Sequence, residues 1–257
     1  MGNDYLVADP AELPFQVSPE RVRLLCDRHE GVGSDGLLLV DARLSLRIFN
    51  PDGSEAEKSG NGIRIAARWL VDTGRAPGPS FTIETPGGAV PVHVEGRVVT
   101  ADMGKPSFRE DVHELELDGE RLPVVALSIG NPHCVVVRDR LDVTDLYRLG
   151  PRIERHAAFP NRTNVQLAQP LARNRVAALI WERGAGETRA SGSSACAVVA
   201  ACHRLEVLDR AAVVQMPGGE LDIRLDDTGD VWMRGPVEEV ARIELSRDLI
   251  TRLQALP

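Results

Sequence analysis

The sequence of 257 residues has few aromatic residues, no metal-binding cysteine pattern and no long apolar segment. Aromatic residues make up 4%, so leucine, valine, isoleucine and alanine must supply most of the core. The four cysteines show no CxxC pair or other spacing of metal ligands, and we expect reduced, buried thiols rather than a metal site. No apolar run approaches the ~20 residues of a membrane-spanning helix. The first residues, "MGNDYLVADP", lack the basic and apolar regions of a signal peptide, which predicts a cytoplasmic protein with no membrane partner.

Basic charge is also in short supply. The chain carries 30 lysines and arginines against 38 aspartates and glutamates, which gives a formal net charge of -8 and a pI near 5.3. Nucleic-acid-binding proteins need basic side chains to neutralise phosphates, so this balance argues against a nucleic-acid partner. The chain is 43% hydrophobic and 26% charged, the composition of a folded globular protein with room for one large domain or two ordinary ones.

The chain contains an internal repeat. Each half has a Gly-Asn dipeptide, a strand, a Ser-Gly pair that opens an amphipathic helix, and a Pro-Gly-Gly turn followed by alternating apolar residues. Each match alone is weak, but four matches in one order indicate a duplication. The matched features are Gly2–Asp4 with Gly130–Pro132, Asn50 with Glu182, Ser59 with Ser191, and Pro86–Gly88 with Pro217–Gly219.

The pattern of elements predicts an α+β fold built from two pseudo-symmetric α/β domains, each with strands wrapped around a central helix. We assign residues 1–116 to the first domain and 117–243 to the second, with the boundary in the segment 113–123, and we expect 244–257 to return to the first. The expected strands cover 44–50 and 175–182, and the expected central helices cover 61–72 and 194–208. Further helices are expected over 19–29, where Ser18 can cap and Pro19 sits at the first helical position, and over 142–149.

The two Ser-Gly loops, Ser59–Gly62 and Ser191–Ser194, are expected on opposite walls of a cleft between the domains. Backbone N–H groups at a helix start lack intrahelical partners, and the helix dipole adds partial positive charge there. Two such starts predict a site for a small anionic ligand. The plainer interpretation is that both serines are ordinary helix caps.

Five motifs together resemble the diaminopimelate epimerase family, in order and in spacing: "GND", "FNPDGSEAEKSGNGIR", "GNPHCV", "FPNRTNVQ" and "WERGAGETRASGSSACAV". The resemblance covers nearly the whole chain and implies two pseudo-symmetric domains with the active site in the cleft between them. It implies an amino-acid isomerase that works without pyridoxal phosphate, metal, nucleotide or other cofactor. It also implies a small amino-acid substrate resembling diaminopimelate, a place in lysine and peptidoglycan precursor synthesis, and is compatible with a homodimer.

The resemblance implies a two-base mechanism in which two cysteines exchange the α-proton. Those two positions are Ser59 and Ser191 here. A helix start lowers a cysteine pKa from ~8.5 into a range of ~3.5–7.5, but a serine hydroxyl is far less acidic. A dipole contribution of ~2 kcal/mol at best shifts a pKa by only one or two units. Efficient racemisation is therefore not expected from the two serines.

The resemblance also assigns the substrate contacts. It places the distal amino-acid end of the substrate on three asparagines and an arginine, the α-ammonium on a glutamate, and the α-carboxylate on backbone N–H groups of the two loops. An N-terminal asparagine belongs to the same site, whereas a glutamine contact found in some members is replaced by Gly36. In the order just given, the implied residues are Asn50, Asn131, Asn164 and Arg183, then Glu182, then Gly60, Asn61, Gly192 and Ser193, and finally Asn3.

Three functions remain open from the sequence. The first is an epimerase whose two thiols are replaced. The second is an isomerase or lyase of the same superfamily with a different base, for which Glu55, Glu57 and Glu187 lie near the serines. The third is a non-catalytic protein that keeps the amino-acid pocket.

Overall fold

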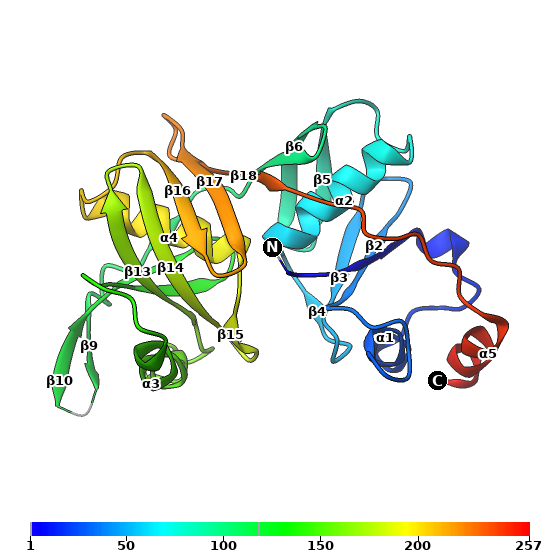
Figure 1. Cartoon of the computed structure of the whole chain (residues 1–257), viewed down its shortest axis with the longest axis horizontal. Coiled ribbons are helices and arrows are strands. Elements are labelled where there is room, and N and C mark those ends of the chain that lie inside the picture. Colours follow the sequence, from blue (N-terminus) through cyan, green and yellow to red (C-terminus); the bar gives the residue numbers. More distant parts are fainter. Residues whose placement is uncertain (1, 118) are drawn as a thin grey trace. The chain divides into compact units, whose positions relative to one another are not determined.

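The computed structural model describes residues 2–117 and 119–257, which form two compact units. Residues Asn3–Ala101 and Pro236–Pro257 form one unit, called here the terminal unit, and residues Asp102–Gly235 form the other, the central unit. Figure 1 traces both units along the chain. The boundaries expected from the sequence, at residues 116 and 243, lie C-terminal to these division points, and that domain assignment stays a prediction. The α+β class is confirmed in each unit.

The terminal unit combines two small sheets with a central helix. The first sheet has the order β1-β2-β3-β4, in which β1 is parallel to β2 and the other neighbours are antiparallel. The second is antiparallel in the order β5-β6-β7, and a bridge between Ser45 and Glu84 connects it to the first. The strands are β1 (Leu6–Ala8), β2 (Leu37–Val40), β3 (Leu46–Phe49), β4 (Glu55–Ala56), β5 (Ser80–Thr85), β6 (Gly88–Glu95) and β7 (Val98–Asp102), whose last residue begins the central unit.

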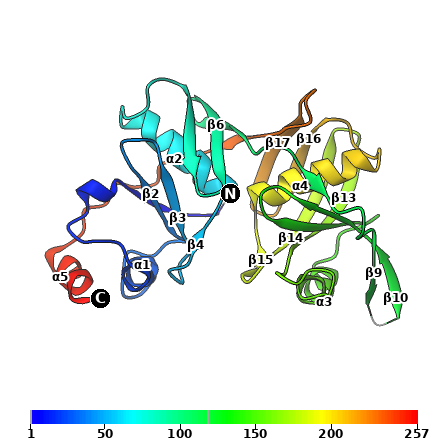
Figure 2. The same cartoon turned by 180° about the vertical axis from the view of Figure 1, so that it is seen from behind.

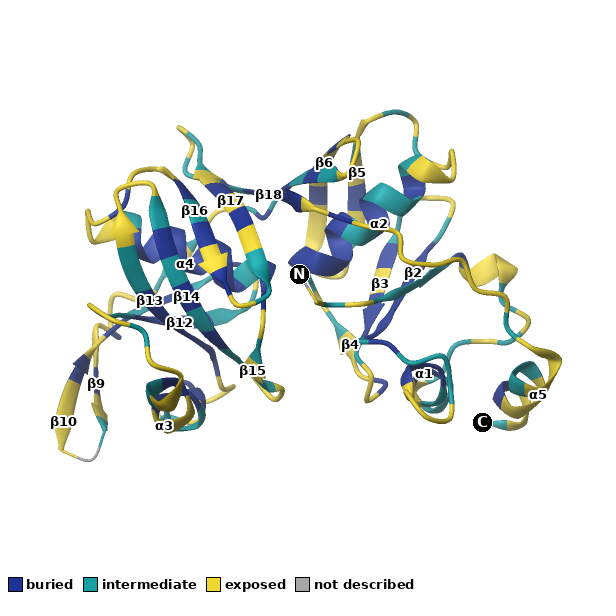
Figure 3. Ribbon diagram, in the orientation of Figure 1, coloured by how far each residue is buried: buried dark blue, intermediate teal, exposed yellow. Residues whose placement is uncertain are grey.

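Helix α2 (Gly60–Asp72) forms the core of the terminal unit. It packs against β1, β2, β3 and β6, and its fully buried face carries Ile63, Ala66, Ala67 and Leu70. The strong apolar periodicity of the sequence produces this face, since residues three and four apart share one side of a helix. Figure 3 shows the buried side of the helix.

A second apolar cluster in this unit joins the two ends of the chain. Helix α1 (Pro19–Cys26) and helix α5 (Arg247–Ala255) lie side by side in both views (Figures 1 and 2). Leu253 of α5 is fully buried against Val22 and Leu25 of α1. Arg21 donates to the carbonyls of Leu253, at 2.8 Å, and Leu256, at 2.5 Å. A short 3-10 helix, η1 (Pro10–Glu12), precedes α1.

The central unit is a larger mixed sheet with the order β8-β11-β12-β13-β14-β16-β17-β18, and β15 pairs with β14. The pairs β12 with β13 and β14 with β16 are parallel, and the other neighbours are antiparallel. The strands are β8 (Ser107–Phe108), β11 (Val125–Ser128), β12 (Pro132–Val137), β13 (Asn164–Ala172), β14 (Arg175–Glu182), β15 (Gly186–Thr188), β16 (Ala211–Met216), β17 (Gly219–Leu225) and β18 (Val231–Pro236), whose last residue begins the returning segment.

Two helices cover this sheet. Helix α4 (Gly192–Arg204) packs against β11–β14, β16 and β17 (Figure 2). It is buried on nearly all sides, which is why it consists mainly of alanine, valine and cysteine. Helix α3 (Val143–Glu154) packs against β13, β14 and β15. Strand β13 serves both helices, because successive side chains alternate between faces: Val165 and Leu167 join the cluster under α3, while Gln166 bonds to α4.

Most expected elements are confirmed, with differences at their ends. The Pro-Gly-Gly segments form the turns of hairpins β5–β6 and β16–β17. Helix α1 ends at Cys26 rather than residue 29, and α4 ends at Arg204 rather than 208, where Glu206 adopts a positive φ of 59°. Helix α3 instead extends to Glu154 and includes Pro151. Residues around the expected boundary form a hairpin of β9 (Glu114–Leu117) and β10 (Glu120–Pro123) within the central unit.

Candidate active site

The two helix starts singled out by the sequence use their serines differently. Both Ser59 and Ser191 occupy the N-cap position with extended backbone, at φ −139° and −144°. The Ser59 Oγ accepts a hydrogen bond from the Gly62 N–H at 3.2 Å and caps α2. Ser191 makes no side-chain cap bond to α4, although it is only 4% exposed. The cap interpretation therefore holds for Ser59 and not for Ser191.

The Ser191 hydroxyl instead lies near the carboxyl group of Glu182, the last residue of β14, and lowers the pKa of that carboxyl. Burial raises the pKa of Glu182, and the hydroxyls of Ser191 and Thr188 partly offset that rise by lowering it. The Thr188 Oγ1 is itself buried and makes no hydrogen bond of standard geometry. A carboxyl group with a raised pKa thus lies beside the start of α4.

The turn that carries Glu182 is fixed to helix α3. Glu154, at the end of α3, is only 3% exposed and accepts hydrogen bonds from Trp181 Nε1 at 2.8 Å and from the Gly184 N–H at 3.0 Å. The Trp181 ring covers Gly150 so closely that a Cβ there would lie 2.7 Å from it. Two donors on one buried carboxylate hold the backbone on both sides of Glu182 in place.

Asn164 and Arg183 are brought together at the opening of β13. The Arg183 N–H donates to Asn164 Oδ1 at 2.9 Å, and Asn164 Nδ2 donates to the Pro132 carbonyl at 2.9 Å. The Arg183 side chain is exposed, with one nitrogen 3.3 Å from the Asn161 carbonyl. Asn164 therefore links the strand that follows Asn131 to the turn that follows Glu182.

A line of polar side chains runs from Asn131 into the unit. Asn131 Oδ1 lies 2.9 Å from His133 Nε2, and His133 Nδ1 lies 3.0 Å from Gln166 Nε2. Gln166 Nε2 also donates to the Ser194 Oγ at 3.0 Å. Complete burial lowers the pKa of His133 to about 3, so the imidazole is neutral at physiological pH.

In the terminal unit, Asn3, Gly60 and Asn61 gather at the start of α2. Asn61 Nδ2 donates to Asn3 Oδ1 at 2.8 Å. The guanidinium of Arg64, which is 2% exposed, donates to Asn61 Oδ1 at 3.0 Å and to the Gly60 carbonyl at 3.3 Å. This arrangement fixes the loop in front of the helix.

Asn50, predicted for the same site, is held in its own turn, where its Nδ2 donates to Ser54 Oγ at 3.0 Å. Gly36 has a φ of 151°, and a Cβ there would lie 2.3 Å from the Phe49 carbonyl oxygen. A glutamine contact at this position is thus sterically excluded without a change in backbone.

The alternative bases near the serines have other environments. Glu55 forms a two-pronged ion pair with Arg47, both contacts at 2.8 Å, and this pairing lowers the pKa of Glu55. Glu187 is hydrogen-bonded to the Tyr147 hydroxyl on the outer side of α3. Glu57 is exposed. A carboxylate stabilised by arginine is a poor proton acceptor, which disfavours Glu55 as a base.

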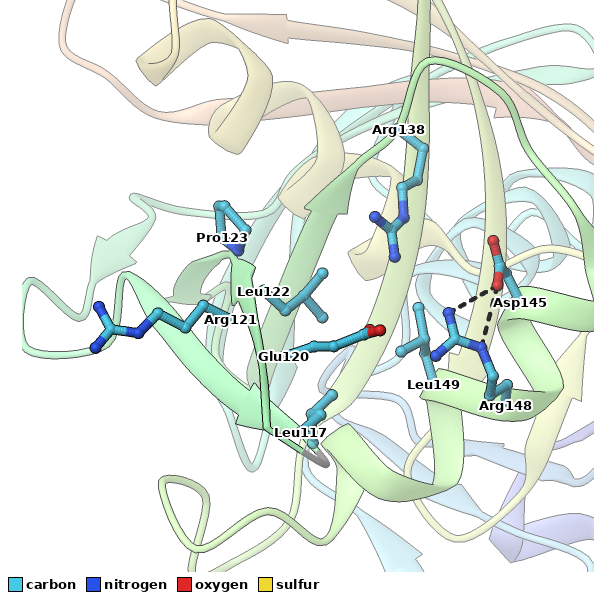
Figure 4. Close-up of a pocket in the computed structure, with 9 residues that line it drawn as sticks. All are labelled: Leu117, Glu120, Arg121, Leu122, Pro123, Arg138, Asp145, Arg148 and Leu149. Carbon is cyan, nitrogen blue, oxygen red and sulfur yellow. Dashed lines mark hydrogen bonds and ion pairs between the residues drawn. The ribbon is translucent and has the colours of Figure 1, made fainter.

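A cavity of about 290 Å³ in the central unit contains none of the predicted site residues. It lies between hairpin β9–β10 and helix α3 and is lined by Leu122, Leu149 and the Asp145–Arg148 ion pair, whose closest atoms are 2.9 Å apart (Figure 4). Among the residues that the structure describes, no cluster of three or more His, Cys, Asp or Glu side chains could hold a metal ion. No helix in the same described ranges is long and apolar enough to cross a membrane.

Comparison with known proteins agrees with these motifs. The family model described as diaminopimelate epimerase matches residues 1–109 and 125–240. The chain belongs to the diaminopimelate epimerase family. It is 43% identical over 268 residues to diaminopimelate epimerase 2 of Nostoc sp., covering 97% of this chain and 94% of that protein. It is 41% identical over 263 residues to the diaminopimelate epimerase of Synechococcus sp., covering 92% of each.

The fold has solved counterparts as well. The crystal structure of a Bacillus anthracis phenazine biosynthesis protein of the PhzF family aligns with a TM-score of 0.68 at 18% identity, covering 92% of this chain and 91% of that one. Membership of the diaminopimelate epimerase family makes this protein an isomerase of the amino-acid epimerase type that acts on a small amino-acid substrate.

The sequence did not single out three residues that shape the site, Glu154, Gln166 and Thr188, and it gave Ser194 only as the last residue of the second Ser-Gly loop. Gln166 and Thr188 lie inside motifs already recognised, "FPNRTNVQ" and "WERGAGET", so the motifs themselves held a signal. Glu154 had none, because its role depends on contacts with residues 27 and 30 positions away.

Proposed function

We propose that the chain binds diaminopimelate and that its reaction is cofactor-independent proton transfer at the α-carbon, which interconverts the LL and meso forms. The observation that carries this proposal is the half-buried Glu182 carboxyl, which lies near Ser191 at the start of α4, within a family of diaminopimelate epimerases. One amino acid would find a partner for each of its polar groups: Glu182 for the α-ammonium, the N–H groups of α4 for the α-carboxylate, and the asparagines for the distal end.

The proposed partner of Glu182 is the α-ammonium group. Two hydroxyls lower the pKa of this carboxyl, and no cation among the described residues contributes to lowering it. A buried carboxylate without a counter-charge is costly, which is why its pKa is raised. A substrate ammonium would supply the missing charge, and its binding would release any proton held by Glu182.

The proposed partner of the α-carboxylate is the start of α4. Gly192 and Ser193 are the first two residues of this 13-residue helix, and N–H groups at such positions have no intrahelical acceptor. Because the Ser191 side chain makes no cap hydrogen bond, it leaves those N–H groups uncapped. The corresponding groups of the terminal unit are those of Gly60 and Asn61, where Ser59 caps the helix through Gly62.

Proton transfer is the step that the two serines limit. A helix start stabilises an anion by at most ~2 kcal/mol, or one to two pKa units, which is too little to ionise a hydroxyl at neutral pH. A carboxylate next to Ser191 further disfavours an alkoxide, because like charges repel. We therefore expect substrate binding with slow or absent turnover.

One observation favours a second candidate, an isomerase that uses a base other than a thiol. The raised pKa of Glu182 brings this carboxyl closer to the range of an effective general base, and the same is not true of Glu55. In this case Glu182 itself, rather than Ser191, accepts the α-proton.

Two measurements test these proposals together. Calorimetry with LL-diaminopimelate measures binding, and NMR in heavy water measures deuterium incorporation at the α-carbon. Binding with slow exchange supports the thiol-less epimerase, and binding without any exchange points to a non-catalytic protein that keeps the amino-acid pocket. Exchange that disappears in Glu182→Gln but persists in the exposed-site control Glu57→Gln supports Glu182 as the base. Absence of binding to either stereoisomer by the folded protein would refute the substrate assignment.

A further inference from the structure

Three buried residues connect Asn131 to helix α4. His133 on β12 is 1% exposed, while Gln166 on β13 and Ser194 on α4 are completely buried. The three hydrogen bonds along the line measure 2.9, 3.0 and 3.0 Å. Buried polar groups of this kind require partners, so the line has few alternative arrangements.

The amide of Gln166 sets the direction of the hydrogen bonds. Its Nε2 lies 3.0 Å from both His133 Nδ1 and Ser194 Oγ, while its Oε1 is buried without a partner. The two hydrogens of the NH₂ group are thus both used, and a single carbonyl oxygen is left over. The reversed amide would leave two buried N–H donors without acceptors, which is the costlier defect.

The direction at Gln166 fixes the tautomer of His133. A neutral imidazole carries one hydrogen, and Nδ1 must be an acceptor because it faces the NH₂ group. The hydrogen is therefore on Nε2, which donates to Asn131 Oδ1. Asn131 then has its oxygen engaged, and its NH₂ group lies on the opposite side of the amide.

We propose that His133, Gln166 and Ser194 are positioning residues that hold Asn131 with its two N–H donors available for the distal carboxylate of the substrate. The inference rests on the proposed function, which gives Asn131 its substrate. A carboxylate accepts hydrogen bonds and donates none when ionised, so an Asn131 amide in the reversed orientation would repel it. Selection of the distal group thus depends on side chains that never touch it.

The same line connects the two proposed substrate-binding ends. Ser194 follows Gly192 and Ser193, whose N–H groups are assigned to the α-carboxylate, and the line ends at Asn131. The distance between the two recognition points is consequently held by a short chain of buried hydrogen bonds. We expect this chain to favour substrates of one length.

The tautomer of His133 is the first readout, because it is measured on the unaltered protein. Nitrogen-15 NMR of the labelled imidazoles distinguishes Nδ1–H from Nε2–H, and the His133 signals are identified by their loss in His133→Asn. The expected result for the unaltered protein is a neutral ring with hydrogen on Nε2. Hydrogen on Nδ1 would overturn the proposal.

The second readout is binding by Gln166→Met, which keeps the length of the side chain and removes the donor. Two ligands that differ only in the distal carboxylate, L-2-aminopimelate and L-2-aminoheptanoate, separate positioning from general damage. We expect the Kd for L-2-aminopimelate to rise about tenfold, or ~1.4 kcal/mol, and the Kd for L-2-aminoheptanoate to stay the same. The His133 ring should also lose its single tautomer.

Gln169→Met is the matched control. Gln169 lies on the same strand, but its amide donates to the Asp139 carbonyl at an exposed site. This variant should leave the tautomer and both affinities unchanged. Equal loss of affinity for both ligands in Gln166→Met would overturn the proposal, since it would show only a structural role.

Failure of the proposed function gives a different pattern. An unaltered protein that has the Nε2–H tautomer but binds no diaminopimelate refutes the proposed function and the substrate role of Asn131 with it. A protein that binds diaminopimelate with the Nδ1–H tautomer refutes the positioning residues alone.

Discussion

The hydroxyl of Ser191 lies near the carboxyl group of Glu182, whose pKa it lowers, and it makes no hydrogen bond to the backbone of the helix that Ser191 begins. The equivalent residue of the terminal unit, Ser59, bonds the Gly62 N–H at 3.2 Å in the usual way. Ser59 and Ser191, which the sequence repeat matches, therefore have different structural roles. Ser59 caps its helix, whereas Ser191 makes no cap bond and lowers the pKa of a neighbouring carboxyl group.

This difference predicts unequal effects of alanine at the two positions. Ser59→Ala should lower the free energy of unfolding by about 1 kcal/mol, because a serine cap of α2 is lost. Ser191→Ala loses no cap and should cost less, while it raises the pKa of Glu182 by removing a group that lowers it. Urea unfolding of both variants measures the contrast, and equal losses would contradict it.

Restoring thiols at the two positions should restore proton transfer. The double variant Ser59→Cys with Ser191→Cys should gain epimerase activity by at least about 100-fold, since a thiolate at a helix start can accept a proton at neutral pH. Each single variant should remain far less active, because the mechanism needs a group on each face of the α-carbon. Conversion of LL- to meso-diaminopimelate provides the assay.

The control for that experiment is Ser193→Cys, which adds a thiol at the second residue of α4, two positions after Ser191. It should not generate activity. A folded double variant that binds diaminopimelate yet stays inactive would show that the serines are not the reason for slow turnover.

His133 predicts a loss of stability in acid. Burial lowers the pKa of His133 to about 3, whereas the unfolded chain has a value near 6.5. Between these values the unfolded state binds more protons, so the free energy of unfolding falls as the pH is lowered from about 6.5 toward 3, by at most ~1.4 kcal/mol per pH unit. Urea titrations at several pH values should show a shallower slope in His133→Asn. The exposed His113→Asn serves as the control and should keep the full slope.

Glu154 predicts a link between stability and ligand binding. Glu154→Ala leaves Trp181 Nε1 and the Gly184 N–H without their acceptor, which should lower the free energy of unfolding by about 2–4 kcal/mol. Because these contacts flank Glu182, the variant should also bind diaminopimelate more weakly. Glu154→Gln retains one acceptor oxygen, so its free energy of unfolding and its affinity should lie between those of the unaltered protein and those of Glu154→Ala. Calorimetry and urea unfolding on the same samples test the link, and a destabilised variant with unchanged affinity would break it.

Local chemistry made much of the fold predictable. Ser18 and Pro19 mark the start of α1, and the Pro-Gly-Gly segments mark two hairpins, because each signal acts within a few residues. The end of α3 was not predictable in this way. A proline usually ends a helix, but α3 passes through Pro151 and buries Ile153 and Glu154 against the sheet. Packing between distant segments decided that end.

The site followed the same division. The sequence motifs led to Ser59, Ser191 and Glu182, yet they gave no indication that only one serine would cap its helix. Gln166 and Ser194 come from a strand and a helix 28 positions apart, and only the folded sheet joins them. Hydrogen bonds between such segments have no local signature, which is why the supporting residues of the site were missed.

The return of residues Pro236–Pro257 to the terminal unit has a consequence for biosynthesis. Helix α5 seals the cluster around Val22 and Leu25 with Leu253, and Arg21 holds the carbonyls of its last turn. The ribosome must therefore synthesise the whole central unit before residues Asn3–Ala101 can pack against the returning segment Pro236–Pro257. The central unit can fold as soon as it is synthesised, whereas the terminal unit keeps part of its apolar cluster uncovered until its C-terminal segment has been translated.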